Sequence, residues 1–163
     1  MYRSRLIDHT DDMSVDEELL GLAVEQAEIG LAEGGIPIGA VLAVGGQVLG
    51  VGHNRRVQWG SAIRHGETDA LEQAGRLPAS TYAKATMYTT LSPCHMCTGA
   101  ILLYGIPRVV IGENRTFLGA EDLLREHGVE VVNLDSSRCF ELMQTFIAAH
   151  PSLWLEDIGE IDE

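Results

Sequence analysis

The chain has 163 residues, 45% hydrophobic and 21% charged, a composition typical of one globular domain. Acidic residues number 24 against 11 Lys and Arg, and the formal charge of −13 repels phosphate backbones and anionic lipid surfaces. The apolar runs are too short to span a bilayer, and the first residues lead into acidic residues rather than an apolar signal core. We therefore expect one cytoplasmic domain over residues 1–163, flexible at 1–13, with a small-molecule substrate and neither nucleic-acid nor membrane partners.

Hydrophobic periodicity places helices and strands along the whole chain. A capping-box pattern at Ser14 starts a run of apolar residues at helical spacing, which ends at Gly34. Two apolar segments then flank Gly45-Gly46, a turn typical of a tight hairpin. The predicted elements are, in chain order, a helix over 15–33, strands over 38–44 and 47–52, a polar loop over 54–64, a helix over 65–76, a strand over 85–91, a helix over 94–104, a strand over 108–112, a weak helix over 120–127, a strand over 129–134 and a helix over 137–149.

The order of these elements predicts the fold class. Strands that alternate with helices imply right-handed parallel crossovers, whereas the opening hairpin is antiparallel. The prediction is a three-layer α/β/α sandwich with a five-stranded mixed sheet. Pro151 is expected to end the last helix, and Trp154 in the acidic tail to pack on the body of the domain.

The strongest chemical feature is Pro93-Cys94-His95-Met96-Cys97, which follows a predicted strand and opens a helix. Residues three apart share one helix face, so both sulfurs can reach one ion. The helix N-terminus favours the thiolate form that zinc requires. A redox pair or two inert buried cysteines remain alternatives, but a zinc ribbon would need a second cysteine pair, and the third cysteine is the single Cys139.

His65-Gly66-Glu67 opens the preceding predicted helix. His65, Cys94 and Cys97 would give one Zn²⁺ three protein ligands and leave the fourth position for water or hydroxide, as in catalytic sites. Glu67 is the candidate proton carrier for that water. Residues two apart on a helix point in nearly opposite directions, so His65 has to occupy the non-helical cap position. Otherwise the pair is a surface histidine and a first-turn glutamate that the helix dipole favours.

The pattern H-x-E followed by P-C-x-x-C is the general signature of zinc nucleobase deaminases. On this pattern the sequence resembles the cytidine deaminase-like superfamily and, within it, the fungal-type free-cytosine deaminases, over about residues 14–160. Further motifs carry the resemblance: Glu33–Gly39, Gly52-His53-Asn54, Thr89–Cys94, Tyr104–Arg108, Gly112-Glu113-Asn114 and Trp154–Glu160.

The resemblance implies an activity and an assembly. Cytosine and water would give uracil and ammonia, a reaction of pyrimidine salvage, at one Zn²⁺ per chain. Glu67 would deprotonate the water, protonate ring N3 and later protonate the departing ammonia. The family is usually homodimeric, so the resemblance implies a homodimer with Tyr104 to Arg108 near the interface.

It also implies a set of base-binding residues. The Asn54 amide would pair with O2 and N1–H of a free base, which a nucleoside could not match. The Gly66 N–H would meet O2, and the Ser92 carbonyl would lie near the amino group. The remaining residues would be Phe117, stacked on the ring, Trp154, covering it, and Asp157, accepting a hydrogen bond from the amino group, the last two in a lid over 152–163.

Three departures from the family pattern leave the substrate open. His95 stands inside the Cys-x-x-Cys loop where an acidic residue is expected, the stretch 114–119 is altered, and Leu155 stands beside Trp154. His95 is either a helix-exposed histidine or a competing metal ligand. The alternatives are a deaminase of another amino heterocycle or of a purine, either guanine or adenosine in tRNA, and a noncatalytic zinc-stabilised binding subunit.

Overall fold

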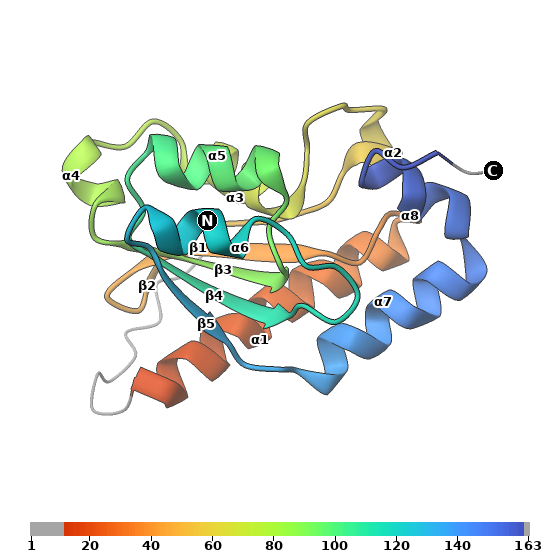
Figure 1. Cartoon of the computed structure of the whole chain (residues 1–163), viewed down its shortest axis with the longest axis horizontal. Helices are drawn as coiled ribbons and strands as arrows, with labels where there is room; N and C mark the ends of the chain where they lie inside the picture. Colours follow the sequence, from red (N-terminus) through yellow and green to blue (C-terminus); the bar gives the residue numbers. More distant parts are fainter. Residues whose placement is uncertain (1–11, 162–163) are drawn as a thin grey trace.

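The computed structural model describes residues 12–161. Five strands form one sheet in the order β2-β1-β3-β4-β5 (Figure 1). The strands are β1 (Gly39–Val44), β2 (Gln47–His53), β3 (Ala85–Leu91), β4 (Arg108–Glu113) and β5 (Glu130–Asn133). The helices are α1 (Asp12–Ala32), α2 (Arg56–Trp59), α3 (Gly66–Ala74), α4 (Ala79–Tyr82), α5 (His95–Leu103), α6 (Glu121–Glu126), α7 (Ser137–Ala149) and α8 (Pro151–Asp157).

The sheet is mixed, as predicted. β1 pairs antiparallel with both β2 and β3, whereas β3, β4 and β5 pair in parallel. Helices α1 and α7 cover one face, and α3, α5 and α6 cover the other (Figure 1). The predicted three-layer α/β/α sandwich is therefore confirmed. Because β2, β3 and β4 run in the same direction, their carboxyl ends meet at one edge of the sheet, the usual place of a ligand site in such folds.

Two close contacts between backbones bring α3 to that edge. A Cβ atom on Gly50 would lie 2.5 Å from the Ala70 carbonyl, and one on Gly52 would lie 2.3 Å from the Ala70 amide nitrogen. Only glycine lets the helix lie this close to the strand. The start of α3 is thereby held beside the end of β2.

The hairpin prediction is confirmed in detail. Gly45 and Gly46 join β1 to β2 with φ angles of 54° and 79°. Both values lie in the left-handed region that a two-residue hairpin turn requires at its central positions.

The predicted helices over 65–76, 94–104 and 120–127 are confirmed with ends shifted by one or two residues. Larger differences occur at the start of α1, in the loop after β2 and at α4. α1 already includes Asp12, so the prediction of Ser14 as its N-cap is wrong; residues 1–11, most of the start expected to be flexible, lie outside the described range. The polar loop after β2 contains the single-turn α2, which ends at Gly60 in the left-handed conformation. The short α4 was not predicted, because four residues carry too little periodicity.

Pro151 was expected only to end a helix, and it also begins one. α7 ends at Ala149, and Pro151 is the first residue of α8. Proline suits the first helical position, where its missing N–H has no intrahelical partner anyway. Trp154 in α8 is buried against Ile36, Leu91 and Phe146, which confirms that it packs on the domain. Within residues 12–161, no helix has the length and apolarity to cross a membrane.

Candidate active site

The site lies where α3 and α5 begin, at the carboxyl edge of the sheet. His65 is the N-cap of α3, with φ −75° and ψ 169°, and Cys94 is the N-cap of α5, with φ −69° and ψ 176°. Both residues therefore have extended backbones directly before a helix. The expectation that His65 occupies a non-helical cap is confirmed, and this is what lets His65 and Glu67 face one cavity despite their spacing.

Three side chains converge at these two caps. His65 Nδ1 lies 3.4 Å from Cys94 Sγ and 3.6 Å from Cys97 Sγ, and the three ligand atoms all lie within 4.8 Å of one another. A tetrahedral zinc ion with ordinary Zn–S and Zn–N bonds needs ligand atoms about 3.5 Å apart. The donor set and its spacing therefore fit zinc, with one position left open.

The charges of the cluster also suit a metal. The hydrogen bond from Cys97, with that from His65, lowers the pKa of Cys94 to about 4, whereas the Cys94 sulfur and burial raise the pKa of Cys97. Burial lowers the pKa of His65, but its hydrogen bonds with Asp157 and Cys94 outweigh this and raise it to about 10. The lowered pKa of Cys94 favours the thiolate, the form of cysteine that binds zinc. Metal binding replaces the remaining protons.

Glu67 lies in the first turn of α3 and is almost fully buried. Its Oε1 atom is 2.6 Å from the hydroxyl of Thr89 in β3. Burial raises the pKa of Glu67 above the ordinary carboxyl value. A carboxyl group whose pKa moves toward neutrality can both accept and donate a proton, as general acid–base catalysis requires. Thr89 was not predicted as a site residue, although its place two residues before the end of β3 points to this edge of the sheet.

One cavity gathers most of the predicted site residues. The apolar walls at Ile38, Leu91 and Ile158 were not predicted. The predicted residues that line it are His65, Glu67, Ser92, Cys94, Phe117, Trp154 and Asp157. The cavity volume is about 20 Å³, enough for roughly one water molecule. A pyrimidine base is several times larger, so a wall has to move before a base can enter.

Asn54, Gly66 and Cys97 are not among the wall residues of this cavity. Cys97 is fully buried behind it and reaches it through the metal cluster. Asn54 contacts Asp157, since its amide nitrogen donates to both carboxylate oxygens at 3.1 Å. Gly66 begins α3 so close to β1 that a Cβ atom would lie 3.3 Å from the Ile38 carbonyl.

Helix α8 covers the cavity. Trp154 meets Phe117 edge-on, with ring centroids 6.1 Å apart. Arg56 in α2 donates to both oxygens of Glu156 at 2.6 and 2.7 Å and to Asp157 at 3.1 Å. Burial raises the pKa of Asp157, but hydrogen bonds from His65, Asn54 and Arg56 lower it below the ordinary value. Asp157 therefore remains a carboxylate at the centre of the cover, and Arg56 is a contact that the sequence did not single out.

The arginines after β2 are bound to acidic partners. Asp69 in α3 is fully buried and accepts from Arg55 and Arg64, both at 2.9 Å, and from the His53 backbone at 3.0 Å. Arg56 is bound to α8. The positive charge of this segment is thus neutralised within the domain.

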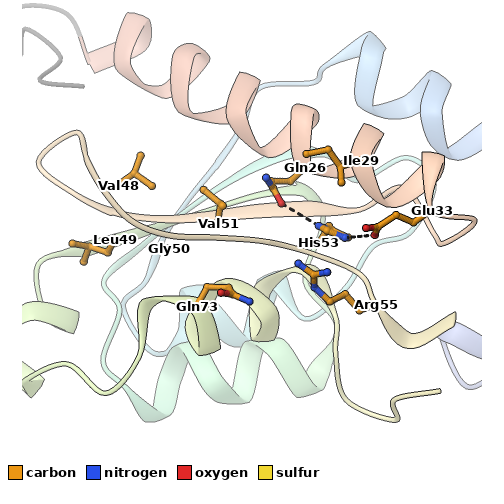
Figure 2. A pocket seen from close by; sticks show the side chains of 10 residues that line it. All are labelled: Gln26, Ile29, Glu33, Val48, Leu49, Gly50, Val51, His53, Arg55 and Gln73. Atoms are coloured by element: carbon orange, nitrogen blue, oxygen red, sulfur yellow. Dashed lines mark hydrogen bonds and ion pairs between the residues drawn. The ribbon is translucent and has the colours of Figure 1, made fainter. Parts of the chain in front are cut away.

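A larger hollow of about 550 Å³ lies away from the metal cluster, along β2 and between α1 and α3 (Figure 2). Its histidine, His53, already has a partner at each ring nitrogen: Gln26 at 3.0 Å and Glu33 at 2.6 Å. Figure 2 shows the ring held between the side chains of Gln26 in α1 and Glu33, the residue after α1. His53 thus anchors the end of β2, directly before Asn54.

His95 is the first residue of α5 and is exposed, outside the metal cluster. The helix-exposed interpretation of His95 is confirmed. Its side chain leaves the three-ligand arrangement unchanged.

Comparisons with known proteins agree with this geometry. The model of the cytidine and deoxycytidylate deaminase zinc-binding region matches residues 13–113. The chain belongs to this family of zinc-binding deaminases. It is 59% identical over 146 residues to a cytosine deaminase of Candida albicans, covering 89% of this chain and 97% of that protein.

Two more distant deaminases share the family or the fold. A tRNA-specific adenosine deaminase of Streptococcus pyogenes is 37% identical over 134 residues, 76% of this chain and 84% of that protein. The structure of a guanine deaminase from Nitrosomonas europaea matches with a TM-score of 0.67 and 21% identity, over 90% of this chain and 88% of that one. This last likeness concerns the fold alone. The predicted membership of the deaminase superfamily is confirmed.

Proposed function

We propose that this protein hydrolyses free cytosine to uracil and ammonia. The observation that carries the proposal is one small cavity lined by His65 and Cys94 of the metal cluster, the buried Glu67 and the carboxylate of Asp157. The 59% identity to a cytosine deaminase over nearly the full length of both proteins supports the choice of base. A noncatalytic binding subunit would need neither an open ligand position nor a buried proton carrier.

Glu67 moves the protons. When bound by His65, Cys94 and Cys97, zinc lowers the pKa of a water molecule and so supplies a nucleophile at neutral pH. Glu67 would accept one proton of that water and pass it to ring N3, and would then move the proton of the new C4 hydroxyl to the leaving amino group. Its raised pKa suits this alternation, and the Thr89 hydroxyl holds Oε1 in place. Water adds to C4 and ammonia leaves, so atoms and charges balance.

The groups proposed to bind the base, Asn54 and Asp157, form hydrogen bonds with each other in this structure. The Asn54 amide donates to Asp157, and its oxygen accepts from the Arg56 backbone at 3.0 Å. A cytosine ring would take over these contacts: O2 and N1–H at Asn54 and the amino group at Asp157, with the Gly66 N–H at O2 and the Ser92 carbonyl near the amino group.

The ring would lie between Phe117 and the lid. Phe117 stacks on the base, and Trp154 covers it from the segment 152–163. A nucleoside carries a sugar on N1, so it would lose the N1–H contact and collide with the cover.

The remaining proposals concern the setting of the reaction. We place it in the cytoplasm, in pyrimidine salvage, without a nucleic-acid partner; the net charge of −13 and the paired arginines support the last point. We also propose a homodimer. Leu103 and Tyr104 at the end of α5 are exposed apolar side chains beside the predicted interface.

An ammonia-release screen of the zinc-loaded protein tests the function. The substrates are cytosine, 5-methylcytosine, cytidine, guanine, creatinine-like amino heterocycles and an adenosine-bearing tRNA. Cytosine is expected to give the highest kcat/KM, and cytidine very little turnover. Release from guanine or tRNA with none from cytosine would contradict the choice of base, and release from none of them would favour the binding subunit.

A further inference from the structure

Glu121, at the start of α6, is a buried carboxylate that neither holds the metal nor lines the cavity. Only 1% of it is exposed. An ionised carboxylate removed from water is costly unless donors surround it. The partners of Glu121 therefore indicate what it does.

Those partners lie in two loops that border the cavity. The Ser92 hydroxyl, after β3, donates to Oε2 at 2.6 Å, and the Asn114 amide, after β4, donates to the same oxygen at 3.3 Å. Arg125 from α6 contacts Oε1 at 3.3 Å. The short hydroxyl–carboxylate distance is that of a charge-assisted hydrogen bond. Glu121 thus joins the residue before Pro93-Cys94 to the loop that carries Phe117.

The backbones of the two loops meet at the same point. The Gly119 N–H donates to the Ser92 hydroxyl at 2.9 Å, so this hydroxyl is donor to Glu121 and acceptor from Gly119. The Ala120 N–H donates to the Pro93 carbonyl at 3.0 Å. A Cβ atom on Gly119 would lie 1.9 Å from that carbonyl oxygen, so only glycine permits the approach.

Hydrogen bonds hold the backbone on both sides of Phe117. On one side, Glu113 Oε2 accepts from the backbone N–H groups of Arg115 and Thr116 at 2.8 and 2.9 Å. On the other side lies the contact of Gly119 with Ser92. The loop is therefore fixed just before and just after the aromatic ring.

We propose that Glu121 is a positioning residue that sets the specificity for the base. It holds the Ser92 backbone and the Phe117 ring at a fixed separation, so that the cavity accepts one ring and its substituents. The proposal rests on the proposed function, because Ser92 and Phe117 are the groups that would touch the base. The Glu121 side chain is not a pocket wall and acts only through them.

The variant Glu121→Gln tests the proposal. The amide keeps the shape and can still accept from Ser92, but it removes the charge. Since small displacements of a positioned group lower rates strongly, kcat/KM for cytosine should fall about 10- to 100-fold, mainly through KM. The ratio of kcat/KM between cytosine and 5-methylcytosine should move toward one, with one zinc per chain retained. The matched control is Asp122→Asn, the next residue, whose side chain is exposed and which should leave both values unchanged.

Ser92→Ala is the second variant, because it removes only the hydroxyl and keeps the carbonyl. It should reproduce the rise in KM, and the double variant should be no worse than the more damaged single variant, as for two members of one hydrogen-bond network. If Glu121→Gln does not fold, the KM and the base selectivity of Ser92→Ala alone test the proposal.

A zinc-loaded variant with KM and selectivity within twofold of wild type would overturn the proposal, and so would additive losses in the double variant. The substrate screen of the wild-type protein distinguishes failure of the proposed role of Glu121 from failure of the proposed function. A wild-type protein that acts on another base contradicts the substrate, whereas the variant-to-wild-type ratios on that base still decide the role of Glu121.

Discussion

The metal end of the site and its cover are built in different ways. The metal end consists of two helix caps, at His65 and Cys94. The local backbone at the start of each helix sets the direction of these side chains. The cover depends on contacts between segments about 100 residues apart, such as Arg56 with Glu156 and Asn54 with Asp157. The caps belong to helices packed on the sheet, whereas α8 has seven residues and packs at one end of the domain.

The metal end therefore carries the groups that react, whereas the cover controls the entry of the base. The ligands and Glu67 lie on packed elements and need no rearrangement to hold a metal. The cavity under the cover has a volume of about 20 Å³, so we expect α8 or the Phe117 loop to move when a base binds. Changes at the caps should therefore abolish turnover, whereas changes in the cover should alter binding and leave the metal in place.

The largest effect is expected from the metal ligands. Cys94→Ala should lose zinc and all measurable deamination, because two ligands hold a divalent ion far more weakly than three. Chelation of the wild-type protein should have the same effect, and added Zn²⁺ should restore activity. Metal analysis measures the zinc content, and ammonia release measures the deamination. The control is Cys139→Ala, which changes a buried cysteine outside the cluster. Full activity without metal would refute the metal centre.

Glu67→Gln should retain zinc and the fold but lower kcat by roughly 10²- to 10⁴-fold, the usual contribution of a positioned acid–base group. The amide keeps the volume of the side chain and cannot carry the proton. Glu72→Gln, an exposed position in the same helix, should behave as wild type. Turnover in the zinc-loaded Glu67→Gln protein above about a tenth of wild type would exclude Glu67 as the proton carrier.

Deleting residues 152–163 should affect binding more than chemistry. The chain would lose Trp154 and Asp157, so KM for cytosine should rise by about 10-fold or more, as expected for the loss of a buried charged hydrogen-bond partner. Zinc content should remain one per chain, because none of the ligands lies in the segment. The comparison is made by zinc analysis and kinetics on one preparation. Unchanged kinetics would show that α8 is not a lid.

The same contrast explains what the sequence could predict. The sheet, the hairpin at Gly45-Gly46 and the three candidate metal ligands follow from short-range patterns. The structure confirms the sheet and the hairpin and brings the three candidate ligands together. Trp154 was expected to pack, but helix α8 was not expected, because Pro151 signals a helix end as readily as a helix start. Arg56 and Glu121 were missed for another reason. A charged residue carries no local signal of a partner that is distant in sequence.

The smallest effect is expected at the rim of the cover. Arg56 lowers the pKa of Glu156 below its ordinary value of 4.5, so the pair stabilises the closed cover. The carboxylate has the lowered pKa only when it is paired. This contribution is therefore fully present above the ordinary value and is lost as the pH falls through the lowered pKa. Glu156→Gln should raise KM about two- to threefold at pH 7, since an exposed ion pair contributes little.

Two further measurements distinguish loss of the Arg56–Glu156 ion pair from a general effect of Glu156→Gln on the fold. The KM difference between wild type and Glu156→Gln should shrink as salt is added, because screening weakens an exposed pair. The difference in melting temperature between the two proteins should disappear in acid. Glu160→Gln, an exposed acid three residues beyond α8, should match wild type throughout. A KM difference that persists unchanged in high salt would mean that packing around Trp154, and not the Arg56–Glu156 pair, holds the cover closed.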